Sequence, residues 1–573
     1  MRRSLTMRSA TAVLHARCRA CMNAPMLRHL INLTIALWLV AGSAPQAMST
    51  AEPIAAQPTT ELALMTWNIW RGGCEDGETI GPDRVVELIR ESGADVVAMQ
   101  ETYGSGERIS EALGFHFAPR GTNVSILSRY PIVEDLSVHE EFMCVGALIE
   151  LPDSSCVAVY SIWLPYSAEI WEAGTRDVSR PETMFAACQA SHESLTAMHA
   201  AIEARLADAK YDNVPVVIAG DFNSMSHLDY GEAGWDQYHA VIDWPTSRIL
   251  THHGFVDTYR ACNPHIDRTR DSTWTPRFPE QEQDRIDFIY VKATQWGATS
   301  SRVLRDHAVQ FPSDHAAVVT TLGRSSNEPR GGSDDGTSIR AVSYNIKHGY
   351  GMDGTIDLDR TAKVLRDLKP DFVGLQEVDL GAARSGQRNQ VNDLAQGLSM
   401  HPAFGSFMEF QGGRYGMAIL SRHPIVNVTR LSLPDGNEPR IALIVEARLP
   451  EGGTVLVVNV HFDWVEDDAY RFRQANVLAE YLRTVTQPFI LLGDFNDESG
   501  SRTLALFEDL ATEIKKPAAR RFTFPSNQPA REIDFIWCAP GTAWISGNTT
   551  VVAEAMASDH RPIVTDLVLR SPD

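Results

Sequence analysis

The chain is short of positive charge. It holds 51 Lys and Arg residues against 73 Asp and Glu, a formal net charge of −22 at pH 7 over 573 residues. Proteins that grip nucleic acid through many phosphate contacts need a surplus of Lys and Arg, so this balance argues against such a binder. A local phosphate site built around a cation is not excluded.

A long hydrophobic run is missing as well. The apolar stretch from Leu30 to Val40 is shorter than the roughly 20 residues that a transmembrane helix needs. It follows a basic start at Met26 and precedes small residues, which is the order of a secretory signal peptide. We therefore expect a leader and signal peptide over residues 1–50 and export to the periplasm or the medium. An uncleaved membrane anchor is the alternative.

Cysteine is scarce. Six of the eight cysteines follow the leader: Cys74, Cys144, Cys156, Cys188, Cys262 and Cys538. In an exported protein some of these could pair, although their spacing does not give the connectivity. Cys538 follows an apolar run and is interpreted as a small buried hydrophobe.

What the chain does contain is one long internal repeat. Its motifs recur in the same order in both halves: LMTWNIW (64–70) and AVSYNIK (341–347), PVVIAGDFNS (215–224) and PFILLGDFND (488–497), RIDFIYV (285–291) and EIDFIWC (532–538), SDHAAVV (313–319) and SDHRPIV (558–564). The period is far too long for a solenoid, so the repeat predicts a duplicated domain. Gly, Ser and charged residues fill 324–338, which we interpret as a linker between domains at 61–323 and 339–570.

Short apolar runs alternate with helical patterns in each half. Runs of five to eight residues rich in Val, Ile and Phe end at Gly, Pro, Asn or Asp, which predicts strands. Amphipathic patterns predict helices at 81–93, 182–210 and 357–368. On the second of these we expect His192 and His199 to face core or solvent rather than a metal. The implied fold is α/β, with two packed β-sheets and helices outside.

Polar residues stand where these strands end. The first half has Asn68, Glu101, Asp221, Asn223, Asp287, Asp314 and His315, and the second has Asn345, Glu377, Asp494, Asn496, Asp534, Asp559 and His560. Burying such groups without partners is costly, so we expect them to share a crevice in each half. Carboxylate and amide oxygens suit a hard cation such as Mg²⁺, and a His beside an Asp can take or hold a proton. Together they predict metal-assisted attack on a phosphoester.

These motifs resemble the endonuclease/exonuclease/phosphatase superfamily. The resemblance rests on TWNIW, MQE, GDFNS, RIDFIY and SDH in the first half and on SYNIK, LQE, NVH, GDFND, EIDFIW and SDH in the second. Members include abasic-site endonucleases, deoxyribonucleases of the secreted pancreatic type, neutral sphingomyelinases and inositol polyphosphate phosphatases. The resemblance implies a four-layer α/β sandwich, two packed mixed β-sheets flanked by helices, present twice in tandem. It also implies Mg²⁺ as cofactor, with Mn²⁺ or Ca²⁺ as alternatives.

The resemblance implies a role for each matching residue. In the second half it assigns the metal to Asn345, Glu377 and Asp559, the nucleophile and phosphate to Asp494 and Asn496, base or transition-state stabilisation to His560 oriented by Asp534, and proton donation to His461. The first half has Asn68, Glu101 and Asp314 at the metal, and Asp221, Asn223, Asp287 and His315 as catalytic groups. Arg384 is interpreted as a phosphate contact or, equally, as a solvated loop arginine.

The first half departs from the pattern at Trp163. Aligning CVAVYSIWLPY with TVLVVNVHFDW puts Trp163 where His461 stands. Because Trp cannot shuttle a proton, this half either uses solvent or another side chain such as Tyr166 as the acid, or it hydrolyses poorly. Trp163 itself could offer a flat wall to a base, sugar or acyl chain, or could pack into the sheet.

We therefore expect an exported, metal-dependent phosphoester hydrolase whose second domain has the complete site. The substrate stays open among nucleic acid, a phospholipid headgroup and a small phosphodiester. The competing hypothesis is that one or both halves bind a ligand or metal with little turnover. No stable protein partner is expected, and the chain should be a monomer.

Overall fold

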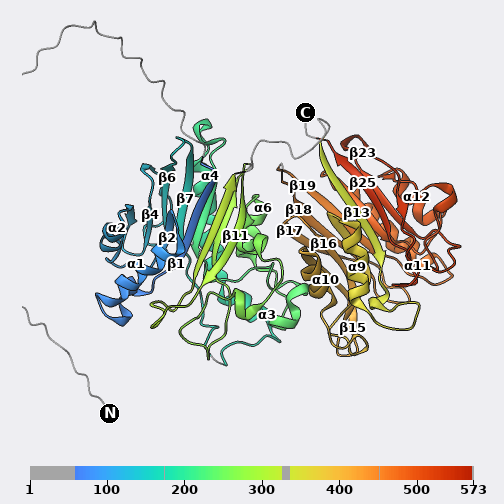
Figure 1. The fold of residues 1–573 in the computed structure, drawn as a ribbon, viewed down its shortest axis with the longest axis horizontal. Coiled ribbons are helices and arrows are strands. Elements are labelled where there is room, and N and C mark those ends of the chain that lie inside the picture. Colours follow the sequence, from blue (N-terminus) through green and yellow to red (C-terminus); the bar gives the residue numbers. More distant parts are fainter. Residues whose placement is uncertain (1–58, 173, 294, 325–335, 451, 571–573) are drawn as a thin grey trace, which may run out of the picture. The chain divides into compact units, whose positions relative to one another are not determined.

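The computed structural model describes residues 59–172, 174–293, 295–324, 336–450 and 452–570 (Figure 1). The expected signal peptide lies outside the described residues, and so does most of the expected linker. The predicted domain limits and export therefore stay predictions. Among the described residues, none of the helices combines the length and the apolar character needed to cross a membrane.

The first half contains two six-stranded sheets. One sheet has the spatial order β11 (Trp296–Leu304), β12 (Ala317–Arg324), β1 (Glu61–Asn68), β2 (Val96–Gln100), β4 (Val124–Ser128) and β3 (His116–Arg120). The other has the order β5 (Ile132–Asp135), β6 (Cys144–Glu150), β7 (Cys156–Trp163), β8 (Val216–Asp221), β10 (Asp287–Lys292) and β9 (Val256–Asp257).

The second half repeats this arrangement. Its first sheet has the order β15 (His401–Phe410), β16 (Gly413–Ser421), β14 (Phe372–Leu380), β13 (Thr337–Asn345), β25 (Ile563–Leu569) and β23 (Trp544–Ser546), with β24 (Thr550–Val551) also paired to β25. Its second sheet has the order β17 (Ile425–Ser432), β18 (Ile441–Arg448), β19 (Thr454–His461), β20 (Phe489–Asp494), β22 (Asp534–Ala539) and β21 (Thr512–Glu513).

All four sheets are mixed. Each contains one parallel pair, β1/β2, β7/β8, β13/β14 or β19/β20, among antiparallel neighbours. The strand order of one half matches that of the other. The predicted tandem α/β sandwich is therefore confirmed.

Helices flank the sheets. In the first half they are α1 (Ile80–Ser92), α2 (Gly106–Leu113), α3 (Pro181–Ala187), α4 (Gln189–Arg205), α5 (Trp235–Tyr238), α6 (Pro245–His252), α7 (Thr258–Cys262) and α8 (Arg268–Asp271). In the second they are α9 (Leu358–Leu368), α10 (Gln390–Leu398), α11 (Ala469–Leu482) and α12 (Arg502–Glu508). Short 3-10 helices occupy Arg71–Asp76, Ala209–Tyr211, Glu232–Gly234, Lys347–Gly349, Ala383–Ser385, Ala518–Arg520 and Gly541–Ala543.

The predicted helix boundaries hold in two places and fail in one. Helix α1 ends at Gly93, whose φ of 76° suits a left-handed cap, and α9 begins after Asp357, whose side chain accepts the Arg360 amide. The single helix expected over 182–210 is instead two, α3 and α4. The chain leaves helical geometry at Cys188, whose buried side chain packs beside Met184.

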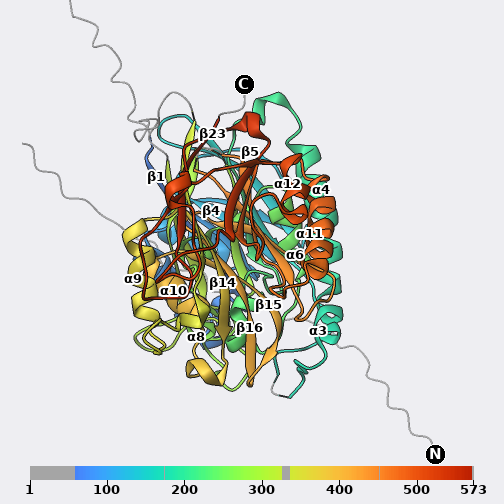
Figure 2. The ribbon, with the colours of Figure 1, turned by 90° about the vertical axis from the view of Figure 1, so that its right-hand side faces the viewer.

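The hydrophobic core forms layers in each half. Residues of both sheets, such as Leu64 and Val217 in the first half and Ile419 and Ile490 in the second, pack between the sheets. Further clusters lie between each sheet and its outer helices. In Figure 2 the helices α9 and α10 lie on one side of the second half's sheets, and α11 and α12 lie on the other.

All six cysteines in the described part of the chain are free thiols. Cys144, Cys188 and Cys538 are buried, as expected for the last of these. Burial raises the pKa of the Cys144 thiol to about 12, so it stays protonated and unreactive at neutral pH. Within the described ranges, therefore, none of the possible disulfides is formed.

Candidate active sites

Acidic groups converge at one edge of each sandwich. Asn68 ends β1, Asp221 ends β8, and Asp287 begins β10. Because β8 and β10 are antiparallel, with Asp221 opposite Asp287, the end of one strand meets the start of the other. The second half repeats the arrangement with Asn345, Asp494 and Asp534. These polar groups thus lie at strand termini, but Asp287 and Asp534 start their strands rather than ending them, and Glu377 lies inside β14.

Asn345 joins two carboxylates in the second half. Its Nδ2 atom donates to Glu377 Oε1 at 3.0 Å and to Asp494 Oδ2 at 3.1 Å. Its Oδ1 atom accepts the backbone N–H of Lys347 at 3.1 Å. Asn345 is fully buried, whereas Glu377 is partly exposed. The amide therefore holds a solvent-accessible carboxylate beside a buried one.

Two imidazoles flank the same buried carboxylate. His560 Nε2 lies 3.6 Å from Asp494 Oδ2, and His461 Nε2 lies 3.6 Å from that same oxygen. His560 Nδ1 faces Asp534 Oδ2 at 3.1 Å, which fixes the orientation of the ring. Asp494 is thus the centre on which the amide and both imidazoles converge.

The electrostatics of this cluster differ from group to group. Burial raises the pKa of Asp494, and nearby Asp534 raises it further. Burial alone would lower the pKa of His560, but the carboxylates of Asp534 and Asp494 outweigh it and raise the pKa to about 10. Burial lowers the pKa of His461 well below its usual range, and Arg440 adds to this. One imidazole is therefore charged at neutral pH and the other is neutral.

The first half reproduces most of the cluster. Asn68 Nδ2 donates to Glu101 Oε1 at 3.2 Å and to Asp221 Oδ2 at 3.1 Å. His315 Nδ1 lies 3.0 Å from Asp287 Oδ2, and its Nε2 lies 3.8 Å from Asp221 Oδ2. Every group expected to meet in this crevice, apart from the second imidazole, is therefore present.

Four residues of the two sites adopt left-handed backbone conformations. Their φ angles are 53° at Glu101, 43° at Asn223, 59° at Glu377 and 51° at Asn496. Such angles cost of order 1–3 kcal/mol for side chains other than glycine and cluster at functional sites. In β14 the strained Glu377 coincides with a bulge between Gln376 and Val378, which turns its side chain out of the ladder.

In both GDFN turns, the asparagine forms hydrogen bonds that fix the turn to the neighbouring strand end. Asn496 N donates to Asp494 Oδ1 at 2.9 Å, and Asn496 Nδ2 donates to the carbonyl of Phe462 at 3.0 Å. Asn223 makes the equivalent bonds to Asp221 Oδ1 and Leu164 O, at 2.9 and 2.8 Å. The amide nitrogens are thus engaged by the protein, while the role of these side chains in holding phosphate stays a prediction.

Trp163 occupies the strand position of His461. It lies opposite Asp221 across the parallel pair β7/β8, as His461 lies opposite Asp494 across β19/β20. Its partly buried ring packs against the core and meets the edge of Phe142 at 5.5 Å between centroids. The first site therefore has an aromatic rim where the second has an imidazole.

Tyr166 is the exposed polar group nearest in sequence to that rim. Partial burial raises the pKa of its phenol, and the charges of Glu169 and Asp221 raise it further. Its ring meets the edge of Trp171 at 5.7 Å between centroids. The phenol is thus neutral at physiological pH and a weaker acid than a free tyrosine, and its role as an alternative acid stays a prediction.

The sequence motifs do not point out three further contacts. Lys347 Nζ pairs with Asp559 Oδ2 at 2.6 Å, and the rings of Phe524 and Trp274 pack against His560 and His315 at centroid distances of 4.9 and 5.0 Å. Lys347 ends the SYNIK motif, so it could have been found by comparing the repeats. The aromatic residues stand at matching places, Trp274 after Thr273 and Phe524 after Thr523, so comparison of the repeats could have found them too.

Trp70 stands in the first half where Lys347 stands in the second. Its ring meets Phe278 at 6.0 Å, and Arg277 lies 5.2 Å above it. Burial raises the pKa of Asp314, which has no lysine partner of this kind, to about 6. The first site has therefore replaced both an imidazole and an ammonium group with indoles.

The Arg384 side chain is held by contacts with the protein and is not a freely solvated loop arginine. It makes two bonds of 2.8 Å to Asp379 and lies 4.5 Å above the ring of Phe410, with its side chain 26% exposed. Glu377 contributes to the raised pKa of the guanidinium, after Asp379, so the arginine lies near the second site. Contact with a substrate phosphate stays a prediction.

The donor groups in both crevices fit a divalent cation. Ligand atoms of Asp494, Asp534 and His560 lie within 4.8 Å of one another, as do those of Asp221, Asp287 and His315. Asp287 Oδ1 is buried without a hydrogen-bond partner. Buried carboxylates in excess of nearby positive charge are what a hard cation neutralises. The assignment of the cation to Asn345, Glu377 and Asp559 stays a prediction; of these, Asn345 and Glu377 are in direct hydrogen-bond contact.

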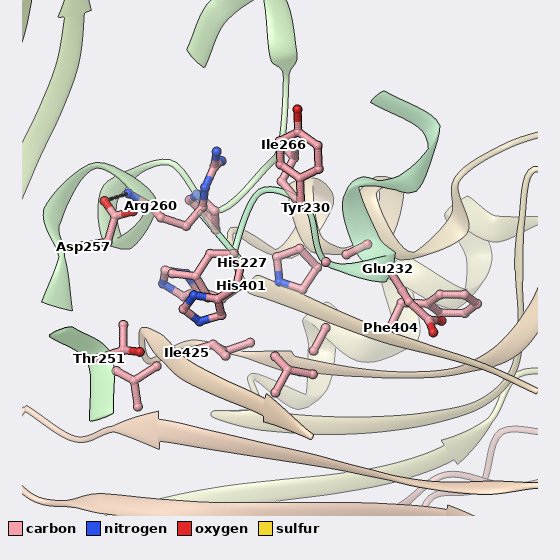
Figure 3. A pocket seen from close by; sticks show the side chains of 18 of the residues that line it. His227, Tyr230, Glu232, Thr251, Asp257, Arg260, Ile266, His401, Phe404 and Ile425 are labelled. Atoms are coloured by element: carbon pink, nitrogen blue, oxygen red, sulfur yellow. Dashed lines mark hydrogen bonds between the residues drawn. The ribbon is translucent and has the colours of Figure 1, made fainter. Parts of the chain in front are cut away.

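A separate cavity lies away from these groups. It measures about 320 Å³, and Figure 3 shows His227, Tyr230, Arg260 and His401 among the side chains that line it. Burial lowers the pKa of His227 well below its usual range. None of the clustered acidic groups lines this cavity, so it is not a candidate active site.

Comparison with known proteins supports the division into two repeats. A family model for the Endonuclease/Exonuclease/phosphatase family matches residues 65–315 and 342–560. An uncharacterized Caenorhabditis elegans protein, F14F9.5, is 28% identical over 291 residues, 45% of this chain and 90% of that protein. The uncharacterized protein YbhP of Escherichia coli K12 is 26% identical over 249 residues, 40% of this chain and 97% of that protein.

One solved structure is described as the endonuclease/exonuclease/phosphatase from Bacteroides vulgatus. It shares 24% identity, covers 41% of this chain and 100% of its own, and has a TM-score of 0.35. Each of these matches spans about one repeat. The family model, by contrast, accounts for both repeats and for more than half of the chain.

Proposed function

Because the chain belongs to the endonuclease/exonuclease/phosphatase family, whose enzymes hydrolyse phosphoesters, we propose that its second half cleaves a phosphodiester with the help of Mg²⁺. The convergence of Asn345, Glu377, His461 and His560 around Asp494 carries this proposal. No one of these groups is specific alone, but together they supply a cation site, a base and two hydrogen-bond donors. The signal-like segment before residue 50 supports export of the enzyme. We further propose that the enzyme acts as a monomer without a stable protein partner.

The reaction adds water to phosphorus and breaks the ester P–O bond. Asp494 orients the water and takes its proton, which its raised pKa favours. As the ester bond breaks, His461 Nε2 gives its proton to the leaving oxygen and takes the proton held by Asp494, 3.6 Å away, so the imidazole stays neutral overall. The products are a phosphomonoester and an alcohol, so no proton is gained or lost.

His560 stabilises the negative charge that develops on the phosphoryl oxygens. Asp534 and Asp494 keep the imidazole protonated, so it can donate a hydrogen bond to a phosphoryl oxygen. Asn496 fixes the turn that carries Asp494. When bound, the cation supplies Lewis-acid neutralisation of the phosphoryl oxygens.

For the first half we propose ligand binding with little turnover. It keeps the acidic groups and His315, but Trp163 and Trp70 stand where His461 and Lys347 would be. Indole rings favour flat or apolar ligand parts such as a base, a sugar or an acyl chain. The observation favouring this second function is therefore the double replacement at one crevice.

The test uses bis(p-nitrophenyl) phosphate with Mg²⁺ and the full chain. His560→Ala should lower the rate by about 10²–10⁴-fold, the size of one acid–base or charge-stabilising group. The matched variant His315→Ala should keep nearly the full rate, because the first half contributes little turnover. Full rate in both variants would refute the site assignment.

A substrate panel separates the remaining alternatives. DNA, sphingomyelin and small phosphodiesters would each be tested with and without a chelator. If the wild type cleaves none of them, the binding hypothesis extends to both halves. Hydrolysis of a small diester alone would identify a soluble substrate, consistent with the acidic balance of the chain.

A further inference from the structure

A third group of metal-ligand side chains lies outside both crevices. The described residues contain three groups in which His, Asp or Glu could share an ion, and the third consists of His199, Glu203 and His253. His199 and Glu203 are four residues apart on α4, and His253 is the C-cap residue of α6. The proposed function uses none of them.

The three side chains already lie at ligand spacing. His253 Nδ1 lies 3.2 Å from Glu203 Oε1, and His199 Nδ1 lies 3.7 Å from Glu203 Oε2. The two imidazole centroids are 4.1 Å apart. Donors around a tetrahedral zinc ion with bonds of about 2.0–2.1 Å stand about 3.3 Å apart, so small side-chain rotations would complete the set.

His199 is buried, with its Nδ1 atom toward Glu203 and its Nε2 atom without a partner; binding of a metal here would depart from the expectation that this residue faces core or solvent. The residue is only 3% exposed, and its Nε2 nitrogen is buried with no hydrogen bond. Burial, and after it the neighbouring His253, lower the pKa of His199 to about 4. The imidazole is therefore neutral at physiological pH, which is the form that binds metal.

The surroundings leave room for a cation and for its remaining ligand. The side chains of Glu203 and His253 are 48% and 46% exposed, so solvent reaches the group from outside. His199 and Glu203 also line a cavity of about 460 Å³. The carbonyl end of α6, where His253 stands, carries the negative end of the helix dipole and favours positive charge.

We propose that His199, Glu203 and His253 form a zinc site that clamps α4 to the end of α6, with water as the fourth ligand. Two imidazoles and one carboxylate suit Zn²⁺, whereas Mg²⁺ prefers oxygen donors alone. Among the described residues of the second half, no such group lies on α11.

The test is a Zn²⁺ titration of the full chain, metal-stripped and then saturated with Mg²⁺ to occupy the oxygen-rich crevices. Wild type should bind one more equivalent of Zn²⁺ than His253→Ala or Glu203→Gln. Co²⁺ used in place of Zn²⁺ should give the visible absorption of a tetrahedral ion in wild type and lose it in both variants. His252→Ala, an exposed imidazole next in sequence, should behave like wild type.

Thermal unfolding gives a readout independent of hydrolysis. Zn²⁺ should raise the Tm of wild type and of His252→Ala, because it binds only the folded arrangement of α4 and α6. It should leave the Tm of His253→Ala and Glu203→Gln unchanged, and circular dichroism would verify that both variants fold. Equal Zn²⁺ stoichiometry in wild type and variants, or equal Tm shifts, would overturn the site while leaving the phosphodiesterase proposal untouched.

Discussion

His461 Nε2 lies 3.6 Å from Asp494 Oδ2, and the matching position of the first half holds Trp163 opposite Asp221. The two residues stand at the same register of equivalent parallel strand pairs. One repeat can therefore move a proton at a point where the other presents an indole. This difference makes the repeats suitable as controls for each other.

Truncating each of the two side chains to Ala should lower activity only at His461. His461→Ala should lower kcat on a phosphodiester with an alkoxide leaving group by about 10²–10⁴-fold, because it removes the proton path to the leaving oxygen. Trp163→Ala, which empties the same register in the first half, should leave kcat near wild type. Steady-state kinetics measures both, and a large loss in Trp163→Ala would mean that the first half turns over substrate.

Lys347→Met tests the ion pair at the mouth of the second site. Lys347 Nζ lies 2.6 Å from Asp559 Oδ2, so its loss leaves an extra negative charge beside the phosphate position. We expect a roughly tenfold fall in kcat/KM, the size of one charged hydrogen bond. Lys363→Met, which removes the exposed pair with Asp367, is the control and should change little. Equal effects would indicate a general charge effect.

Removal of divalent metal should abolish hydrolysis reversibly. The clustered carboxylates of the second site need a cation to bind an anionic phosphodiester, so EDTA should stop the reaction and Mg²⁺ should restore it. Glu377→Gln should require a higher Mg²⁺ concentration for half-maximal rate, because it removes a solvent-facing ligand. Activity that persists in EDTA after dialysis would contradict a metal-dependent mechanism.

Acid should lower the folding stability of the first half, because Asp271 becomes protonated. This fully buried carboxylate lies 2.9 Å from Arg260 and accepts the Tyr259 hydroxyl at 2.7 Å. Burial alone would raise its pKa, but Arg260, Arg270 and the hydrogen bonds lower it to about 2. The folded pKa lies below the unfolded one, so the stabilisation of about 2 kcal/mol is complete above about pH 4 and is lost as the pH falls toward 2.

Asp271→Asn should therefore lower the unfolding free energy at pH 7 by about 2 kcal/mol and flatten its acid dependence. Urea unfolding at pH 7 and at pH 3 measures both effects. Asp306→Asn removes an exposed carboxylate and should behave like wild type at both pH values. A constant difference between Asp271→Asn and wild type across this range would place the effect in packing rather than in charge.

Most of the architecture follows from patterns repeated within the sequence. Strand runs that end in Gly-Asp-Phe-Asn occur twice, and burial of their polar ends forces them to one edge of the sandwich. The order of SYNIK, GDFND, EIDFIW and SDH was sufficient to bring Asn345, Asp494, Asp534 and His560 together. Because the motifs occur twice in the same order, each repeat supports the interpretation of the other.

Other contacts are harder to predict, because they depend on how loops fold back. The rings of Phe524 and Trp274 pack against His560 and His315 from matching Thr–aromatic pairs, but the segments between these pairs and the next strands differ in length, which obscures the match. The break at Cys188 also escaped prediction, because Ala, Met and Glu on both sides favour helix and only tertiary packing interrupts it.

The left-handed backbone at Glu377 limits the thermal stability that an active enzyme can reach. Glycine would tolerate that φ of 59° without penalty and should make the domain more resistant to heat, yet it would delete the carboxylate on which Asn345 depends. Screens for heat-tolerant variants should thus recover inactive proteins at this position. Both repeats have this costlier residue, at Glu101 as well as at Glu377.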